Sequence, residues 1–300
     1  MRRFVINILL FALILAVTLA AGELLVRNDF NSYKYKDQYV RSHGQAISTL
    51  ILGDSHNYYN ISAAELGDSA FNLANVSQNY EYDFRLLEQY LPILPHLHTV
   101  ILSMSYGSLR VPDFEHGEVP FYASNYKMYM DIDKHSDFSL YNFEIAWPEI
   151  YSGRVRRAIF GGRGGCDSLG QSTNNVPSDY YKGWTSRTAA FAVEQTISDT
   201  TQVAQNVYWL DRICKLCHTH GIRTVLVTTP LYIEYRRHMD PEQSAEMKRV
   251  SAMMQRRYGT VCLDYMADKR FTFKDFYDGD HLLRGPATRR LSNLIRADMQ

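Results

Sequence analysis

Five short runs of mostly apolar, often β-branched residues recur along the chain, and each has the length of a single β-strand. Runs of this kind, without strict alternation of polar and apolar positions, are typical of strands that are buried on both faces. The pattern therefore predicts a parallel sheet of about five strands. The five runs cover residues 47–52, 70–73, 99–104, 224–228 and 260–263.

Between and after these runs, apolar residues recur every three or four positions, which predicts amphipathic helices. Asp240 followed by Pro241 suits the start of one helix, and Gly259 suits its end. Strands that alternate with helices predict an α/β fold whose parallel sheet is covered on both faces. In such sheets the active site lies beyond the carboxyl ends of the strands. The predicted helices cover about residues 80–91, 203–217, 241–258 and 287–300.

The first 22 residues have the pattern of a signal anchor or a signal peptide. Arg2 and Arg3 precede an apolar run over residues 4–21, which is close to the ~20 residues that span a bilayer as a helix. Positive charge before the run predicts a cytoplasmic N-terminus and export of the residues after the run. The length of the run favours a retained anchor, while the small residues at its end leave cleavage open. We expect residues 23–300 to work in the cell envelope, on the periplasmic or extracellular side, or to be secreted after cleavage.

One long stretch, residues 110–200, fits the alternation of strands and helices poorly. It is rich in aromatic residues, glycine and short polar runs. We interpret it as an insertion into a single domain of residues 23–300, lying over the strand ends as a lid or part of a substrate cleft. The polar, tyrosine-rich residues 23–46 are expected to form a stalk or an N-terminal wrap.

The charge balance and composition narrow the class of partner. The chain of 300 residues has 32 basic and 32 acidic residues, so its formal net charge is zero. Because nucleic-acid-binding proteins usually have a basic excess, nucleic acid is disfavoured as a partner. Hydrophobic residues make up 46% of the chain, which is typical of a folded globular protein and not of a disordered one.

Cys214, Cys217 and His218 match the attachment motif of c-type haem. The two cysteines, however, continue the apolar stripe of the helix predicted over residues 203–217, where cysteine behaves as a small hydrophobic residue. We therefore expect these cysteines to be structural, with a c-type cytochrome as the alternative. No second pair of ligands lies at a spacing usual for a metal site, so neither a metal nor another cofactor is expected.

Two short motifs, one near each end of the predicted domain, carry residues suited to nucleophilic catalysis. Gly53-Asp54-Ser55 follows the first predicted strand directly, which places Ser55 at the carboxyl edge of the sheet. Two residues separate Asp278 from His281, and this spacing lets a carboxylate hold one imidazole nitrogen while the other faces a nucleophile. A serine needs such a base, and the base needs a partner that orients it.

Taken together, the two motifs resemble those of the SGNH, or GDSL-type, hydrolases. In that family the first block ends in Gly-Asp-Ser and the last block is Asp-x-x-His-Leu, a pattern that residues 278–282 match. The resemblance covers the chain from about Ile47 to its end, apart from the insertion. It implies a three-layer α/β/α sandwich with a flavodoxin-like parallel sheet.

The resemblance also implies a role for each residue of the two motifs. Ser55 is expected to attack a carbonyl, His281 to act as the general base, and Asp278 to orient the imidazole. Asp280 is an alternative partner for His281, and the family spacing favours Asp278.

An oxyanion hole is implied as well, built from the backbone N–H of Ser55, a glycine N–H of the second block and an asparagine side chain of the third. Ser77 stands at the glycine position, where any residue can supply a backbone N–H. Gly107 stands at the asparagine position, so that donor is missing, and losing one donor can cost ~100- to 1000-fold in rate. Either Asn75 or Asn79 replaces it, or both simply cap their loop.

Tyr232 and Tyr235 follow the fourth predicted strand and are candidates for substrate binding. Their rings either stack on a sugar or pack on the edge of the domain. The same alternatives apply to His56, Tyr58 and Tyr59, which flank the nucleophile.

The layout of a membrane segment before an exported SGNH domain with an atypical third block resembles proteins that O-acetylate or deacetylate cell-surface polysaccharides. We therefore predict an exported serine esterase or O-acyltransferase that acts on acyl esters, first of all acetyl esters, of an envelope or extracellular polysaccharide. Its partners would be that acylated carbohydrate, the membrane and the envelope polysaccharide machinery. The alternative is a catalytically weak, membrane-tethered polysaccharide-binding or assembly factor that retains the fold. The residues do not separate hydrolysis from transfer, or identify the acyl group, the glycan or the oligomeric state.

Overall fold

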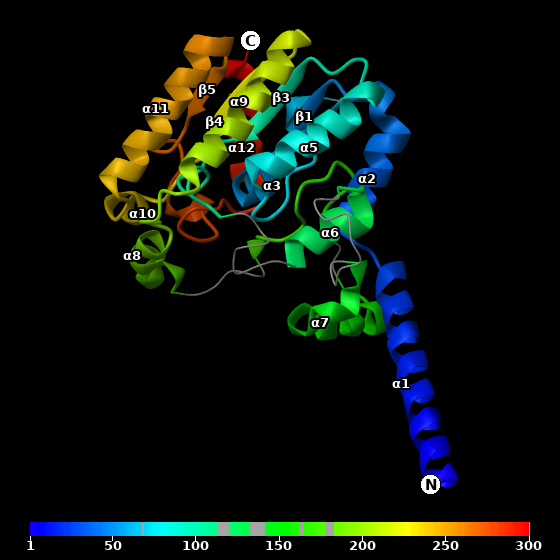
Figure 1. Cartoon of the computed structure of the whole chain (residues 1–300). Helices are drawn as coiled ribbons and strands as arrows, with labels where there is room; N and C mark the ends of the chain where they lie inside the picture. Colours follow the sequence, from blue (N-terminus) through cyan, green and yellow to red (C-terminus); the bar gives the residue numbers. More distant parts are fainter. Residues whose placement is uncertain (68, 113–120, 133–141, 163–164, 178–182, 300) are drawn as a thin grey trace. The chain divides into compact units, whose positions relative to one another are not determined.

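Five parallel strands form the sheet of the larger of two units, in the order β2-β1-β3-β4-β5 (Figure 1). The computed structural model describes residues 1–67, 69–112, 121–132, 142–162, 165–177 and 183–299. Every predicted run overlaps one strand, which confirms the predicted parallel α/β sheet. The strands are β1 (Thr49–Ile51), β2 (Ala70–Asn72), β3 (Thr99–Ser103), β4 (Arg223–Thr228) and β5 (Val261–Asp264).

Helices cover both faces of this sheet and complete three layers. On one face α5 packs on α9, and α11 packs against α9 and β5; on the other, α12 packs against α3 and α4. Figure 1 shows α5 and α9 in front of the strands and α12 behind them. The helices are α3 (Ser55–Asn60), α4 (Ala63–Leu66), α5 (Tyr80–Tyr90), α8 (Trp184–Glu194), α9 (Val203–Thr219), α10 (Ile233–Arg237), α11 (Pro241–Tyr258) and α12 (Pro286–Asp298). Short 3-10 turns are η1 (Gly44–Ala46), η2 (Leu91–Ile93) and η7 (Phe273–Asp275).

The helix α11 shows how local sequence sets the ends of these elements. The side chain of Asp240 accepts a hydrogen bond from Gln243 N at 2.7 Å, and so caps the first turn. Gly259 follows the last turn with a φ of 69°, a left-handed conformation that favours glycine. Both ends lie where the sequence predicts them.

The smaller unit comprises residues Met1–Asp37 and Phe114–Gly165, and the larger comprises Gln38–Asp113 and Cys166–Gln300. The predicted insertion over residues 110–200 is therefore divided between the two units. Within the smaller unit, α1 contacts both η5 and α7. Its elements are α1 (Arg2–Asn28), α6 (Phe121–Met130), η5 (Glu144–Ala146) and α7 (Pro148–Phe160), while α2 (Ser32–His43) includes the residue at which the units divide.

Most of residues 23–46, for which the sequence predicts a stalk or an N-terminal wrap, are helical. The helix α1 continues to Asn28, and Ser32–His43 form α2. The polar residues in the last turns of α1 have partners: the carboxylate of Glu23 accepts hydrogen bonds from Glu144 N and Ile145 N, both at 3.0 Å. These long-range contacts stabilise a helix that the local pattern does not predict.

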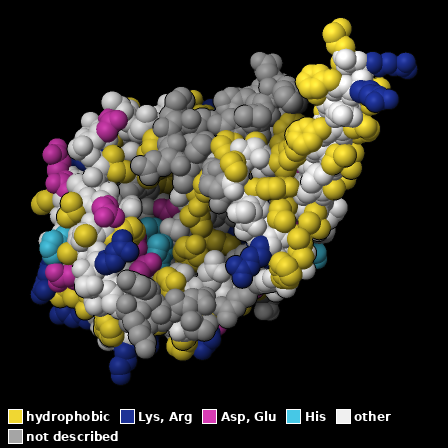
Figure 2. Space-filling view, turned by 90° about the horizontal axis from the view of Figure 1, so that it is seen from below, with side chains coloured by type: hydrophobic (Ala, Val, Ile, Leu, Met, Phe, Trp, Pro, Cys, Tyr) yellow, Lys and Arg dark blue, Asp and Glu magenta, His cyan; other side chains and the backbone are white. Residues whose placement is uncertain are grey.

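Within the described part of the chain, α1 is the helix that is long and apolar enough to cross a membrane. Its most apolar window of 18 residues has a mean hydropathy of 2.8 and is 0% buried. Apolar side chains cover much of the face of α1 that is in view in Figure 2. This agrees with a retained anchor and equally with a signal sequence.

Candidate active site

Ser55 lies at the carboxyl edge of the sheet, where it is the first residue of α3 and follows the end of β1. The turn before it requires glycine, since Gly53 has a φ of +110° and a Cβ there would lie 2.6 Å from Cβ of Ser103. In the sheet β1 lies between β2 and β3, so the strand order reverses direction beside it. Open parallel sheets commonly bind ligands at such a reversal, beyond the carboxyl ends of the strands.

The structure brings the three residues of the predicted triad together. The hydroxyl oxygen of Ser55 lies 2.9 Å from Nε2 of His281, and Nδ1 of His281 lies 3.1 Å from each carboxylate oxygen of Asp278. With a proton on Nδ1, which we assign from these contacts, Nε2 accepts a hydrogen bond from the serine. This is the hydrogen-bond order of a nucleophile, its base and the group that orients the base.

The loop that carries Asp278 and His281 is held to the nucleophile helix by a residue that the sequence motifs do not include. Asn60, the last residue of α3, accepts a hydrogen bond from Leu282 N at 2.8 Å, while its amide group donates to Thr229 Oγ1 at 3.3 Å. Asn60 is fully buried. It therefore joins the base loop to the end of β4 and to the helix that begins with Ser55.

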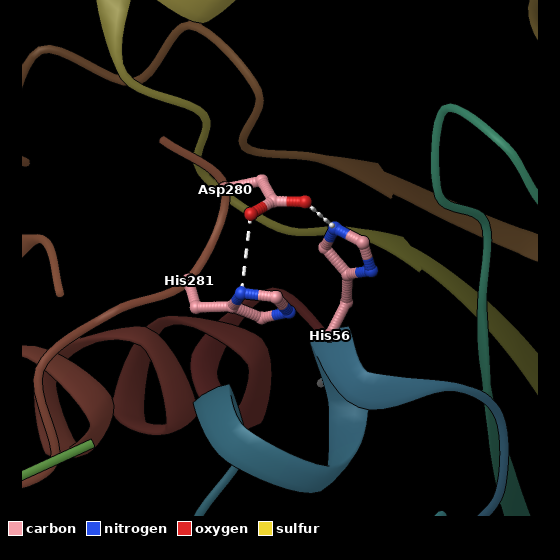
Figure 3. Close-up of side chains that lie close together, drawn as sticks. All are labelled: His56, Asp280 and His281. Atoms are coloured by element: carbon pink, nitrogen blue, oxygen red, sulfur yellow. Dashed lines mark ion pairs between the residues drawn. The ribbon is translucent and has the colours of Figure 1, made fainter. Parts of the chain in front are cut away.

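A second carboxylate, Asp280, also reaches the imidazole of His281. Its Oδ1 lies 3.1 Å from Nδ1 of His281, as an ion pair whose direction does not satisfy hydrogen-bond geometry. Its Oδ2 lies 3.5 Å from Nε2 of His56, so Asp280 stands between two imidazoles (Figure 3). The side chain of Asp280 is 5% exposed, against 33% for Asp278.

Next to the nucleophile, Asp54 anchors the other side of His56. One oxygen of Asp54 lies 3.2 Å from Nδ1 of His56 and accepts a hydrogen bond from Ser103 Oγ at 2.7 Å. The other accepts from Ser105 Oγ at 2.5 Å. Burial alone would raise the pKa of Asp54, but the charge of His56 and the three side-chain hydrogen bonds outweigh it and lower this pKa to about 2.

The two imidazoles are surrounded by negative charge. Burial lowers the pKa of each, but the carboxylates of Asp54 and Asp280 raise the pKa of His56 to about 9. For His281, Asp278 and Asp280 outweigh burial and raise the pKa well above its ordinary value. The neighbouring carboxylates therefore make His281 a stronger base than a free histidine. The ring of Tyr59 packs edge-on against that of His281, with centroids 5.1 Å apart.

Two predicted oxyanion donors, Ser55 and Ser77, have backbone N–H groups that are not engaged by other described residues. In the part of the chain that the structure describes, the N–H groups of Ser55 and Ser77 have no hydrogen-bond partner. Ser77 has a φ of 58°, the left-handed conformation that glycine adopts most readily. Its loop is tied to the nucleophile turn, since Asn75 N donates to Gly53 O at 3.2 Å.

The predicted side-chain replacements for the missing asparagine are engaged elsewhere. Nδ2 of Asn75, which is 1% exposed, donates to Gln78 Oε1 at 3.0 Å and to Leu73 O at 3.3 Å. The side chain of Asn79 accepts from Tyr82 N and caps α5. In this structure both asparagines therefore have the capping role that the sequence left open, and the prediction of Asn75 as an oxyanion donor is corrected.

Packing also accounts for the two predicted substrate-binding tyrosines. Tyr235 is 2% exposed and lies in a hydrophobic cluster with Tyr106 and Leu231, so it has no ring face for a sugar. The ring of Tyr232 is partly buried and makes an edge contact with Trp184 at a centroid distance of 5.0 Å. Burial corrects the prediction for Tyr235, and Tyr232 contributes mainly to the core under the base loop.

Ligand atoms of His56, Asp280 and His281 lie within 4.8 Å of one another, a grouping that also occurs around metal ions. Here Asp280 already pairs with both imidazoles, and His281 presents its remaining nitrogen to Ser55. The contacts are therefore those of an ion-pair network linked to a triad.

Comparisons with known proteins give a distant likeness among solved structures. No family model matches the chain, and no curated protein sequence matches it. Among solved structures, the chain is similar to a proposed SGNH hydrolase from Slackia heliotrinireducens, with a TM-score of 0.38 and 12% sequence identity, over 85% of this chain and 99% of that one. The fold and the site are defined by the strand order and the side-chain contacts.

Proposed function

We propose that this chain is a serine ester hydrolase or O-acyltransferase of the SGNH type. The observation that carries the proposal is the contact of 2.9 Å between Ser55 Oγ and His281 Nε2, with Asp278 at the other imidazole nitrogen. A serine hydroxyl in this setting is an activated nucleophile, whose natural targets are carbonyl carbons.

In the proposed reaction, Ser55 Oγ bonds to the ester carbonyl carbon while its proton passes to Nε2 of His281. The carbonyl oxygen takes the negative charge, and the backbone N–H groups of Ser55 and Ser77 are the proposed donors to it. When the C–O bond of the ester breaks, His281 gives its proton to the leaving alkoxide. Water or a sugar hydroxyl then attacks the carbonyl carbon of the acyl-serine and gives its proton to Nε2 of His281. The bond between that carbon and Ser55 Oγ breaks, His281 returns the proton to Ser55 Oγ, and the free acid or the acylated sugar leaves.

For the substrate we propose acyl esters, first of all acetyl esters, of a cell-envelope or extracellular polysaccharide. Support comes from the layout of the chain, in which a helix able to cross a membrane precedes the α/β fold. The same layout supports a place for the protein in the envelope, with α1 as an anchor. Whether water or a sugar hydroxyl accepts the acyl group depends on how far the bound site excludes water.

The experiment uses the full chain in detergent, a fluorophosphonate probe that labels activated serines, and p-nitrophenyl acetate. We expect labelling and acetate release in the wild type, and loss of both in Ser55→Ala. Ser186→Ala, which removes an exposed serine from α8, is the matched control and should behave as the wild type. Adding acetylated and unacetylated polysaccharides then separates hydrolysis from transfer by the product that carries the acetyl group.

The lack of a side-chain oxyanion donor favours a second candidate function. Gly107 has no side chain to donate, and Asn75 is committed to its own loop. A well-folded wild-type protein that is neither labelled nor active would contradict the enzymatic proposal. The fold would then serve as a membrane-tethered polysaccharide-binding or assembly factor, which binding measurements with the same polysaccharides would test.

A further inference from the structure

Asp280 is the centre of a buried series of charged groups, His281, Asp280, His56 and Asp54, that extends beyond the triad. It contacts Nδ1 of His281 through one oxygen at 3.1 Å and Nε2 of His56 through the other at 3.5 Å (Figure 3). The two imidazole rings lie 5.1 Å apart between their centroids. Asp280 is buried, so water screens these interactions little.

The Asp54 end of this series of charged groups is fixed to the sheet. Nδ1 of His56 faces Asp54 at 3.2 Å, and Asp54 is held by the hydroxyls of Ser103 and Ser105. His56 directly follows the nucleophile, and its backbone N donates to Asp54 at 3.0 Å. A single series of contacts therefore links the end of β3, the nucleophile turn and the base loop.

A cation at His56 balances part of the negative charge in this series of buried groups. Three carboxylates, those of Asp54, Asp278 and Asp280, surround two imidazoles. With a pKa of about 9, His56 keeps its proton at neutral pH and neutralises the carboxylates on either side of it. Without that cation, the effect of Asp280 and Asp278 on His281 would be unopposed, and the pKa of His281 would rise still further above its ordinary value.

We propose that His56 and Asp280 are positioning residues that set the basicity of His281, Asp280 by favouring its protonated form and His56 by opposing it. This inference deepens the proposed function, because it concerns the base of the proposed triad. The geometry gives the two residues opposite effects on one nitrogen-bearing ring. Asp280 is an anion in contact with the His281 ring. The His56 cation pairs with the other oxygen of Asp280, and its ring centroid lies 5.1 Å from that of His281.

Three tyrosines and one further carboxylate face this series of charged groups. Burial raises the pKa of Tyr59, which packs on His281, and that of Tyr235, which lies near Asp280. Burial also raises the pKa of Tyr80, which lies on α5 near Asp54. Asp83, also on α5, has a pKa raised by burial to about 8 and acts on Asp54, so Asp83→Asn serves as a background control.

The test measures the imidazole titrations directly, by nitrogen-15 NMR of histidine-labelled full chain in detergent, with signals assigned by substitution. In Asp280→Asn we expect the pKa of His281 to fall by about one unit, since an adjacent anion is lost. In His56→Gln we expect it to rise by about one unit, since an adjacent cation is lost. His56→Lys retains a cation and should return the pKa of His281 towards the wild-type value.

Opposite shifts are a readout that a merely structural role would not produce. Unchanged pKa values, or shifts of the same sign in folded Asp280→Asn and His56→Gln proteins, would overturn the proposal. If either variant fails to fold, Asp280→Glu and His56→Lys keep the test open, and near-wild-type titration of His281 in both is then the expected result. Stoichiometric zinc, with titrations that change on chelation, would instead make the cluster a metal site and overturn the inference.

The pH dependence of fluorophosphonate labelling gives the second readout. Because labelling needs unprotonated His281, its acidic limb should move to lower pH in Asp280→Asn and to higher pH in His56→Gln. The two proposals fail in different ways. Absence of labelling in the wild type with the expected NMR shifts would contradict the proposed function alone, whereas normal labelling with an unmoved limb would contradict only the role of His56 and Asp280.

Discussion

The hydroxyl oxygen of Ser55 lies 2.9 Å from Nε2 of His281, although 226 positions separate the two residues along the chain. Ser55 is placed by the end of β1 and His281 by a loop near the C-terminus, and Asn60 joins the two. The nucleophile and its base therefore depend on one another through the packing of distant segments.

The two carboxylates beside His281 should differ in importance. Asp278→Asn should lower kcat/KM for p-nitrophenyl acetate by about 10³- to 10⁴-fold, because Asp278 accepts the hydrogen bond that fixes the tautomer of His281. Asp280→Asn should cost far less, about 10-fold, because Asp280 makes an ion pair without hydrogen-bond geometry. The rates are compared on the plateau of each pH profile, and equal losses would undo the assignment of Asp278.

Asn60 should be needed for the placement of His281. Asn60→Ala leaves the buried Leu282 N–H without its acceptor, so we expect a loss of about 1–3 kcal/mol in the free energy of unfolding. Slower fluorophosphonate labelling should accompany it. Asn60→Asp keeps the acceptor oxygen and is the matched control for this bond. If Asn60→Ala unfolds and reacts as the wild type does, the base loop is positioned by other contacts.

Ser77 should contribute through its backbone and not through its hydroxyl. Ser77→Ala and Ser77→Gly should therefore retain esterase activity, in contrast to Ser55→Ala. Because residue 77 is in the left-handed region, Ser77→Gly should raise the free energy of unfolding by about 0.5–1 kcal/mol, and the β-branched Ser77→Val should lower it. Denaturant unfolding and ester hydrolysis are measured on each variant. A loss of activity in Ser77→Ala would identify the hydroxyl as the donor.

Asp83 should make the protein less stable as the pH rises. Burial raises the pKa of Asp83 to about 8, partly offset by hydrogen bonds from Gln78 and Gly53, so folded Asp83 keeps a proton that the unfolded chain loses near pH 4. The stability that this proton contributes is complete below that pH and is lost as the pH rises to about 8, by up to about 1.4 kcal/mol per pH unit. Asp83→Asn should flatten the dependence.

The window from pH 5 to 6.5 isolates Asp83 in chemical unfolding experiments. The pKa of His56 is raised from about 6.5 to about 9, so its contribution is complete below pH 6.5 and is lost only between those values. A wild-type protein whose stability does not fall between pH 5 and 6.5 would show that Asp83 ionises freely in the folded state.

Cys214 and Cys217 should be inert in the folded protein. Both are fully buried in α9, and burial raises the pKa of Cys214 to about 12 and that of Cys217 to about 11. Since the thiolate is the reactive form, neither should react with Ellman's reagent at pH 8 until the chain is unfolded. The purified protein should also lack the absorption band of haem. A haem band, or rapid modification of either thiol before unfolding, would reverse the structural interpretation of this motif.

Much of the fold was accessible from local patterns. The five strands, the ends of α11 at Asp240 and Gly259, and the packing role of Cys214 and Cys217 were all predicted correctly. Strand runs, caps and helical stripes are properties of neighbouring residues, so the sequence alone specifies them. The helical continuation of α1 was missed, because Glu23 is satisfied by backbone groups of η5 more than a hundred residues away.

The candidate site divides in the same way. The sequence by itself predicted a triad of Ser55, Asp278 and His281, through the resemblance of two motifs to those of a known family, and the structure places these three side chains in contact. Only the tertiary structure decided that Asn75 caps its loop, that Tyr235 is core, and that Asn60, His56 and Asp280 surround the base. The contacts of Asn60 with Leu282 and of His56 with Asp280 join residues more than two hundred positions apart, and the burial of Tyr235 depends on residues of other elements. Such distances are set only when helices and strands pack around the sheet, so no pattern along the chain encodes them.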